Sequence, residues 1–493
     1  MRFPIVRRAS LVGVLAVVAA RAATIRLETA VREPSYHDGD QQQPLGPVVV
    51  DGASGFSWRT YPQDDRTCVA NTTHFTGRVP VTPEKELFFW FAESRRDPHG
   101  DPTILWLNGG PAASSMPGFF QEVGPCALVG NATAANPDSW VNFANVLVLD
   151  QPAGAGFSMA AGASAPTTLA EGTVDFGVFL AAFVARFPWY FRGGLYVAGE
   201  SFGGRYAPRY TADVVSRQLE RAADAVPVKV EGVILVDAFV DGVSHAIGHY
   251  DLFCTDEYQD LLRFNETVCE SLGAAIPRAE YLLGVCQESH DPVDCSAAVK
   301  YASANIERYL QDEVAKGKLS PYDIRLPCEL PDVSCIPPAE FYTVPYLNTP
   351  GIQELLGFDA PREYLAANFS LNALWSEQPE ILIPTTRNVS WLLDEGGLRV
   401  LVFNGVYDAA ITTPGIFREF DQLPWSQRDV FREQPKVDWH WTDSRGTAIR
   451  GGKIKGVPRL RVASVYDAGH MSPGDAKPAV SSLVRQWIES GHT

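Results

Sequence analysis

A serine stands between two glycines in the segment Gly199-Glu200-Ser201-Phe202-Gly203. This Gly-x-Ser-x-Gly spacing is typical of a nucleophile elbow, a tight turn between a strand and a helix that exposes the serine hydroxyl. The residues before the motif read as a buried strand and those after it as a helix, which is the context that an elbow requires. The backbone N–H of Phe202 at the helix start can donate to an oxyanion. The spacing therefore predicts a nucleophile at Ser201.

A serine nucleophile requires a base, and the base requires an acid to orient it. In the α/β-hydrolase order, the acid and then the histidine follow the serine along the chain. Asp408 lies at the end of the apolar segment "LVFNGVYDAA", and His470 lies in the glycine turn of "DAGHMSP", after a later apolar segment. Each alone could be a capping aspartate or a surface histidine. Their positions at the ends of two predicted strands favour Asp408 as the acid and His470 as the base.

The elements that must position these residues alternate along the chain. Apolar runs that end in glycine-rich turns, such as "PTILWLNGG" and "NVLVLDQPAG", are typical of buried parallel strands. Helices are expected at residues 169–187, 204–223 and 478–491. The alternation predicts a mostly parallel central sheet with helices on both faces. Together with the elbow and the order of serine, acid and histidine, it indicates an α/β-hydrolase fold. The rhythm breaks at about residues 240–345, which hold six of the eight cysteines and indicate a disulfide-stapled insertion, or lid subdomain.

The N-terminus predicts export from the cytoplasm. Residues 1–23 combine a basic start, a short apolar stretch and small residues, as secretory signal peptides do. Residues 24–60 indicate an N-terminal extension or short propeptide, and residues 61–493 the catalytic domain. Glycosylation is expected at five Asn-x-Ser/Thr sites: Asn71, Asn131, Asn265, Asn368 and Asn388. Secretion is the expected location, and a vacuolar or lysosome-like compartment is the alternative.

Composition excludes several classes of partner. The 493 residues carry a formal net charge of −17, which opposes binding to nucleic acid and to anionic lipid surfaces. No apolar run after the signal is long enough for a membrane anchor. No cofactor or metal site is expected, because the chain lacks a Cys-x-x-Cys pair, and His245 and His249 have no glutamate between them. The oligomeric state is left open.

From about Tyr61 to the C-terminus the sequence resembles the serine carboxypeptidases. Five segments match blocks of that family in order: "LNGGP" (107–111), "DQPAGAGFS" (150–158), "GESFGGRY" (199–206), "YDIRLPC" (322–328) and "AGHMSP" (468–473). The resemblance implies a triad of Ser201, Asp408 and His470. It also implies that the backbone N–H groups of Gly110 and Phe202 form the oxyanion hole.

The resemblance also implies a role for the glutamate beside the serine. An enzyme that removes C-terminal residues must recognise a free carboxylate, and the family assigns this to Trp106, Asn108, Glu122 and Glu200. A carboxyl group binds a carboxylate only when a proton lies between them. Neighbouring, partly buried carboxyl groups titrate at raised apparent pKa values. The expected activity is therefore that of a secreted acid serine carboxypeptidase acting on peptide or protein C-termini through an acyl-enzyme. The alternatives are a related acyltransferase or esterase, or an inactive homologue.

Further positions follow from the same resemblance. Tyr322 and Met471 match residues that line the pocket for the leaving residue. Four disulfides are implied: Cys68–Cys126, Cys254–Cys269, Cys286–Cys295 and Cys328–Cys335. The sequence also departs from the family pattern, because Ala112 and Ala113 replace a glycine and a cysteine after "GGP". The partner of that missing cysteine corresponds to Ala367, so both cysteines of one family disulfide are absent.

Overall fold

The described part of the chain in this computed structural model comprises residues 48–51, 57–255, 257, 262–317, 319–329, 335, 336 and 341–491. The predicted signal peptide and most of the predicted extension lie outside these ranges. The chain from Leu45 to Thr493 forms one compact unit.

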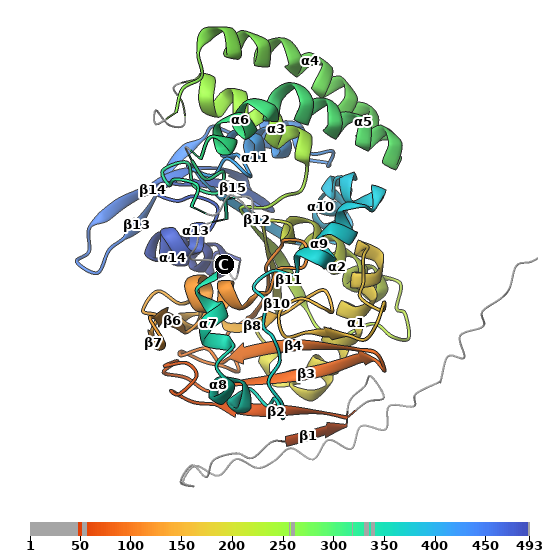
Figure 1. Ribbon diagram of the computed structural model, residues 1–493, viewed down its shortest axis with the longest axis vertical. Coiled ribbons are helices and arrows are strands. Elements are labelled where there is room, and N and C mark those ends of the chain that lie inside the picture. Colours follow the sequence, from red (N-terminus) through yellow and green to blue (C-terminus); the bar gives the residue numbers. More distant parts are fainter. Residues whose placement is uncertain are drawn as a thin grey trace, which may run out of the picture. The chain divides into compact units, whose positions relative to one another are not determined.

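Thirteen strands of the described residues form one mixed sheet. Its order is β1-β2-β3-β4-β8-β5-β10-β11-β12-β15-β14-β13, with β9 paired to β4 (Figure 1). The strands are β1 (Val48–Asp51), β2 (Ser57–Gln63), β3 (His74–Thr82), β4 (Lys85–Ala92), β5 (Thr103–Leu107), β8 (Asn145–Leu149), β9 (Met159–Ala160), β10 (Leu195–Glu200), β11 (Val230–Val236), β12 (Arg399–Gly405), β13 (Val437–Thr442), β14 (Ala448–Val457) and β15 (Leu460–Val465). A separate hairpin pairs β6 (Cys126–Val129) with β7 (Ala132–Ala135).

The helices occupy the connections between the strands. The α-helices are α1 (Leu169–Arg186), α2 (Gly203–Leu219), α3 (Gly242–Cys254), α4 (Glu266–Ser289), α5 (Pro292–Ala302), α6 (Arg308–Ala315), α7 (Thr343–Leu347), α8 (Pro350–Leu355), α9 (Phe369–Ser376), α10 (Thr386–Asp394), α11 (Thr413–Gln422), α12 (Arg428–Arg432), α13 (Ser472–Asp475) and α14 (Lys477–Glu489). Shorter 3₁₀ or π segments are η1 (Gly118–Val123), η2 (Trp140–Asn142), η3 (Pro188–Phe191), η4 (Ser303–Glu307) and η7 (Pro379–Leu382).

The strands predicted from apolar runs form the parallel centre of the sheet. The pairs from β8 through β5, β10, β11 and β12 to β15 are all parallel. Antiparallel strands extend both edges, β1 to β4 on one side and β14 and β13 on the other. These edge strands were not predicted from the sequence. Parallel strands bring their carboxyl ends to one edge, which places the ends of β10, β12 and β15 close together.

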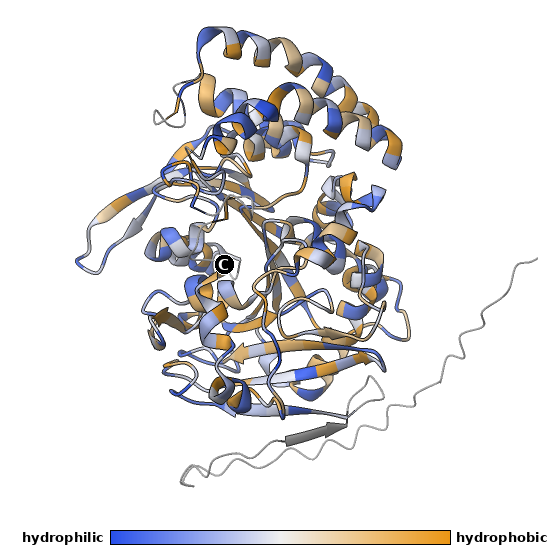
Figure 2. Cartoon of the chain, viewed as in Figure 1, coloured by the Kyte–Doolittle hydropathy of each residue, from blue (hydrophilic) through white to orange (hydrophobic). Residues whose placement is uncertain are grey.

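Each central strand is buried on both faces. Side chains of β5 alternate between two cores, with Leu105 on one face and Trp106 on the other. Phe183 of α1 and Tyr206 of α2 pack in the first core, and Trp487 of α14 packs in the second. Figure 2 shows apolar colours along the central strands. The predicted arrangement of helices on both faces of an α/β-hydrolase sheet is therefore confirmed.

The connection between β11 and β12 is long and contains α3 to α10 in the described residues. In Figure 1, α4 and α5 lie at the top of the view, beyond α3 and α11. Disulfides Cys254–Cys269 and Cys286–Cys295 join α3 to α4 and α4 to α5. These helices share a small apolar core of their own, which includes Ile247, Leu272 and Leu283.

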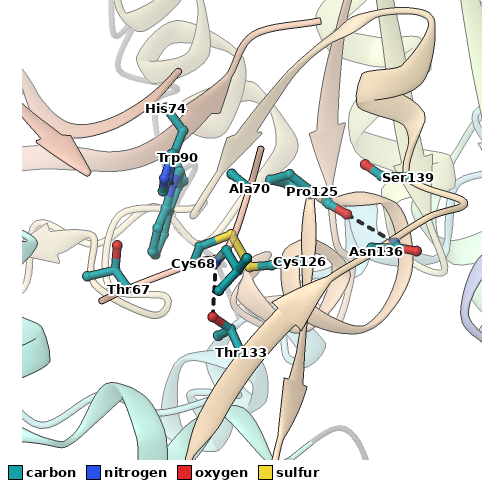
Figure 3. Close-up of a disulfide and its surroundings, with 12 residues drawn as sticks. Thr67, Cys68, Ala70, His74, Trp90, Pro125, Cys126, Thr133, Asn136 and Ser139 are labelled. Carbon is teal, nitrogen blue, oxygen red and sulfur yellow. Dashed lines mark hydrogen bonds between the residues drawn. A yellow bond between two sulfur atoms is a disulfide. The ribbon is translucent and has the colours of Figure 1, made fainter. Parts of the chain in front are cut away.

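The structure contains all four disulfides that the resemblance implies, and none of the described cysteines is unpaired. Cys68–Cys126 ties the segment after β2 to β6, and both cysteines are fully buried (Figure 3). The backbone N–H of Val69 donates to Oγ1 of Thr133 on β7 at 3.0 Å. This bridge therefore anchors the chain directly after η1, the segment that carries Glu122.

Ala113 and Ala367, which replace the missing family cysteines, face each other as an isolated antiparallel β-bridge. Opposed residues in such a pair have Cα atoms about 4.5–5.5 Å apart, which is within the range of disulfides. Combining Ala113→Cys with Ala367→Cys is expected to create a further disulfide and raise the free energy of unfolding by about 2–4 kcal/mol. Urea unfolding and non-reducing peptide mapping test this, with the two single variants as controls. Two unpaired thiols in the purified double variant would contradict it.

Candidate active site

The nucleophile elbow has the geometry that its sequence requires. β10 ends at Glu200, α2 begins at Gly203, and Ser201 between them has a φ of 56°. A Cβ atom at Gly199 would lie 2.2 Å from the carbonyl oxygen of Gly203, and one at Gly203 would lie 2.8 Å from that of Leu107. Larger residues at either position would therefore clash with backbone. The turn holds Ser201 in the left-handed region, which non-glycine residues seldom adopt.

The acid and base candidates meet at the carboxyl edge of the sheet. Asp408 follows β12 and His470 follows β15, and Nδ1 of His470 lies 2.7 Å from Oδ2 of Asp408. The other oxygen of Asp408 accepts a hydrogen bond from the N–H of Ile411 at 2.9 Å. The backbone N–H of His470 donates to the carbonyl of Tyr322 at 2.7 Å. With Nδ1 donating to a carboxylate, Nε2 is the nitrogen that can accept a proton from a serine.

Burial raises the pKa of Asp408, and the charge of a protonated His470 lowers it, with burial the larger effect. Asp408 is fully buried, so its negative charge is most stable when the imidazole beside it is positive. This pairing favours the imidazolium that forms when His470 takes a proton.

A cavity of 320 Å³ brings the candidate groups together. Ser201 and His470 both line it, as do the two oxyanion-hole candidates, Gly110 and Phe202, and the pocket candidate Tyr322. The ring of Tyr322 lies edge-on to that of His470, with centroids 5.1 Å apart. The remaining lining residues are Pro111, Phe239, Ser376, Ile381, Leu382, Ala410 and Ile411.

The loop after β5 lies against the elbow. A Cβ atom at Gly109 would be 2.3 Å from the backbone nitrogen of Phe202, so the two backbones are in close contact. Gly110 has a φ of 103° and Ala112 a φ of 64°. The left-handed conformation costs an alanine about 1–2 kcal/mol. A glycine would avoid that cost, but it would lose a buried methyl group and more conformational entropy on folding, about 1–2 kcal/mol together. Ala112 is therefore compatible with this loop.

The predicted carboxylate-binding residues form a buried hydrogen-bonded chain. Nε1 of Trp106 donates to Oδ1 of Asn108 at 2.7 Å, and Nδ2 of Asn108 donates to Oε2 of Glu200. The backbone N–H of Asn108 donates to Oγ of Ser115 at 3.0 Å. A Cβ atom at Gly118 would lie 2.3 Å from Nε1 of Trp106, so η1 packs directly against this chain.

Glu122 is buried on η1 and has a cation nearby. Lys477 on α14 donates from Nζ to the carbonyl of Gln121. Burial lowers the pKa of Lys477, and the charges of Glu122, Asp138 and Asp475 oppose that shift. The charges of these three carboxyl groups therefore favour the protonated form of Lys477.

The predicted pocket residue Met471 and the predicted glycosylation sites do not line the cavity. Met471 is partly buried at the N-terminus of α13 and is not among the residues that line the cavity. Asn71, Asn131 and Asn265 are exposed, whereas Asn368 is partly buried and Asn388 lies within α10. The Nδ2 group of Asn368 donates to the carbonyl of Gly154 at 2.9 Å.

The apolar wall of the cavity, formed by Phe239, Ile381 and Leu382, was not predicted from the sequence. Phe239 lies within the apolar segment "VEGVILVDAFVDG" (230–242), three residues after β11 ends at Val236, and its position just beyond a buried strand was a usable signal. The other two belong to η7, a short 3₁₀ segment without apolar periodicity.

Clusters of metal ligands and membrane-spanning helices are both absent from the described residues. No group of three or more His, Cys, Asp or Glu side chains there could hold a metal ion. His245 and His249 are instead buried on α3, where Nε2 of His249 lies 2.8 Å from the carbonyl of Ala409. Over the same described ranges, no helix combines the length and apolar character needed to span a bilayer.

Comparison with known proteins identifies the family. A family model described as serine carboxypeptidase matches residues 62–490. Carboxypeptidase Y homolog A of Coccidioides posadasii is 30% identical over 408 residues, covering 82% of this chain and 72% of that protein. Carboxypeptidase Y homolog A of Chaetomium globosum is 31% identical over 408 residues, covering 82% and 70%.

A solved structure shares the fold. The crystal structure of Kex1(Δ)p, a prohormone-processing carboxypeptidase from Saccharomyces cerevisiae, superposes with a TM-score of 0.71 at 22% sequence identity. The match covers 85% of this chain and 92% of that chain. With a family match that extends over most of its length, the chain belongs to the serine carboxypeptidase family of hydrolases.

Proposed function

We propose that the protein is a secreted serine carboxypeptidase that works in acid, with Ser201 as nucleophile, His470 as base and Asp408 as the acid that orients it. Ser201 attacks the last peptide carbonyl while His470 takes the hydroxyl proton. The backbone N–H groups of Gly110 and Phe202 donate to the oxyanion. His470 then protonates the leaving amine, and water hydrolyses the acyl-enzyme by the same route.

The observation that carries this proposal is the shared cavity. Gly110 lies in the loop after β5, Ser201 and Phe202 lie in the elbow, and His470 lies in the loop after β15, yet all four line one space of 320 Å³. The bond of 2.7 Å from His470 to buried Asp408 supports the assigned tautomer. Nucleophile, base and oxyanion donors around a single space are what acyl transfer requires.

The carboxylate-binding role belongs to the chain of Trp106, Asn108 and Glu200, together with Glu122. Because Oε2 of Glu200 accepts from Asn108, a proton on Glu200 would reside on Oε1. From there it would donate to the carboxylate of the substrate. Binding that depends on a protonated carboxyl group weakens as pH rises, which is the basis of the proposed acid optimum.

Secretion is supported by the sequence of residues 1–23 and by the exposed sites Asn71, Asn131 and Asn265. The exposed sequons would accept glycans without disturbing packed side chains. Cleavage near residue 23, with residues 24–60 as an extension or short propeptide, completes the proposed maturation.

The direct test is hydrolysis of a blocked dipeptide with a free C-terminus, compared with its C-terminal amide, at acidic pH. We expect release of the last amino acid from the acid form at a much higher kcat/KM than from the amide. A fluorophosphonate should abolish the activity and modify one serine. Transfer of the acyl group to another acceptor without hydrolysis would instead indicate an acyltransferase.

The cavity wall predicts the preferred acyl-side residue, which is the penultimate residue of the substrate. Phe239, Ile381, Leu382 and Ile411 line the cavity, whereas the carboxylate-binding residues do not. Burying a phenylalanine side chain contributes about 1.5–3 kcal/mol of favourable free energy, whereas burying a charge without a partner is unfavourable. The kcat/KM should therefore be at least about 10²-fold higher for peptides with Phe as the acyl-side residue than for peptides with Asp there.

The measurement uses one leaving residue throughout and varies only the acyl-side residue. Leu382→Ala should lower kcat/KM for acyl-side Phe while leaving acyl-side Ala nearly unchanged. Equal rates for acyl-side Phe and Asp would show that this cavity does not hold the acyl side chain.

A further inference from the structure

One aspartate outside the proposed triad joins the loops that carry its acid and its base. Asp237 directly follows β11 and is fully buried. Its Oδ1 accepts a hydrogen bond from the backbone N–H of Gly405 at 2.8 Å. Its Oδ2 accepts from the backbone N–H of Ser472 at 3.0 Å and from the hydroxyl of Ser472 at 2.6 Å. A single carboxyl group therefore connects the end of β12 with the segment that follows β15.

Both partners lie next to the proposed catalytic groups. Gly405 ends β12, and its carbonyl accepts from the N–H of Asp408 at 3.3 Å. Ser472 is buried at the start of α13, two residues after His470. A shift of either bond to Asp237 would therefore move Asp408 or His470 relative to the other.

The same segment also contacts the nucleophile. The N–H of Ser201 donates to the carbonyl of Val236 at 3.0 Å, and the N–H of Phe239 donates to the carbonyl of Ser201 at 2.7 Å. The N–H of Asp237 donates to the carbonyl of Phe403 on β12 at 2.9 Å. Residues 236–239 thus touch the loops of all three proposed triad members.

The backbone brings the acid and base loops together beside Asp237. Asp237 itself has a φ of 44°, in the left-handed region that aspartate adopts more readily than most non-glycine residues. A Cβ atom at Gly405 would lie 2.1 Å from the carbonyl oxygen of Gly469, so the acid and base loops are in direct backbone contact. Asp237, which follows β11, stabilises this contact through its hydrogen bonds to Gly405 and Ser472.

We propose that Asp237 is a positioning residue for hydrolysis, which holds the Asp408 and His470 loops in register with Ser201 through its bonds to Gly405 and Ser472. This inference rests on the proposed function of the triad. Asp237 is not among the residues that line the cavity, so it should affect the chemical step and not substrate binding. A misplacement of about 1 Å in such a group lowers the rate by about 10²-fold.

The test compares Asp237→Ala with Asp237→Asn. The alanine variant loses every side-chain bond and should lower kcat about 10²-fold, with KM within about two-fold of wild type. Asparagine keeps one oxygen to accept from the N–H of Gly405, and its NH2 group can donate to the hydroxyl of Ser472, but it loses the bond from the N–H of Ser472. It should therefore recover kcat only in part, to within about ten-fold of wild type. Fluorophosphonate titration normalises each preparation to its reactive serines.

Asp101→Ala is the matched control. Asp101 is also a buried aspartate, and it accepts from the hydroxyl of Ser94 at 2.6 Å, but neither residue lines the cavity. This variant should lower thermal stability and leave kcat within about two-fold of wild type. A loss of kcat that merely reflected destabilisation would appear in both variants.

A double-mutant cycle with Ser472→Ala tests the positioning role of Asp237 even if Asp237→Ala does not fold. The hydroxyl of Ser472 should act through Asp237, so combining Ser472→Ala with an Asp237 substitution should cost less than the product of the separate effects. Multiplicative losses in kcat, or an Asp237→Ala enzyme within two-fold of wild type, would overturn the inference. A wild-type protein without Ser201-dependent hydrolysis would instead overturn the proposed function.

Discussion

Ser201→Ala is expected to lower kcat/KM for a blocked dipeptide by about 10⁴-fold or more while leaving the fold intact. The substitution removes only a hydroxyl group, because the left-handed backbone of the elbow is set by the packing of Gly199 and Gly203 and already carries a Cβ atom at Ser201. Without the hydroxyl no acyl-enzyme forms. The oxyanion hole and substrate binding supply the residual rate. His470→Ala is expected to lower kcat/KM by a similar factor, since the members of a triad act as one unit.

The control is Ser216→Ala on α2, the helix that begins two residues after Ser201. Ser216 bonds the carbonyl of Asp213 at 3.0 Å and is not part of the cavity. Circular dichroism and thermal melts confirm folding, and intact mass after fluorophosphonate treatment counts reactive serines. Wild type and Ser216→Ala should each gain one adduct, and Ser201→Ala none. More than about 1% of wild-type turnover in a clean Ser201→Ala preparation would place the nucleophile elsewhere.

Local patterns were sufficient for the central strands and for the candidate triad. Strands buried on both faces read as continuous apolar runs, and the turns that follow them carry glycines and the polar groups of the site. Ser201, Asp408 and His470 each sit within a few residues of such a run. Since parallel strands place their carboxyl ends at one edge, three separate local signals predicted one shared site.

Tertiary contacts decided what local patterns could not. β13 and β14 have mixed burial because they form an exposed edge hairpin, so no apolar run marked them. Ile381 and Leu382 reach the cavity from a 3₁₀ segment within the long β11–β12 connection. Asp237 carries no distinguishing local signal, because its bonds to Gly405 and Ser472 join segments far apart in the sequence. For the cavity wall and for Asp237, the contacting residues are distant in sequence.

The second large expected effect is a fall in kcat/KM with rising pH that depends on Glu200. Above the pH at which Glu200 loses its proton, kcat/KM for a peptide acid should fall about 10-fold per pH unit, because each unit lowers the protonated fraction ten-fold. The fall in kcat/KM with rising pH follows from charge, since a protonated carboxyl group donates to the substrate carboxylate and an ionised one repels it. The loss should appear mainly in KM, because the contact is made to a non-reacting group in the ground and transition states alike.

Glu200→Gln separates donation from titration. Glutamine keeps an oxygen for Nδ2 of Asn108 and offers an N–H that does not titrate, so the alkaline rise in KM should flatten. Its kcat can fall as well, since the side chain adjoins Ser201. Glu220→Gln, an exposed position at the end of α2, is the matched control and should keep the wild-type profile. The measurement is KM against pH for the acid and amide forms of one peptide. The amide lacks the charge that Glu200 would recognise, so equal pH dependence of the two forms in wild type would exclude this role for the glutamate of the elbow.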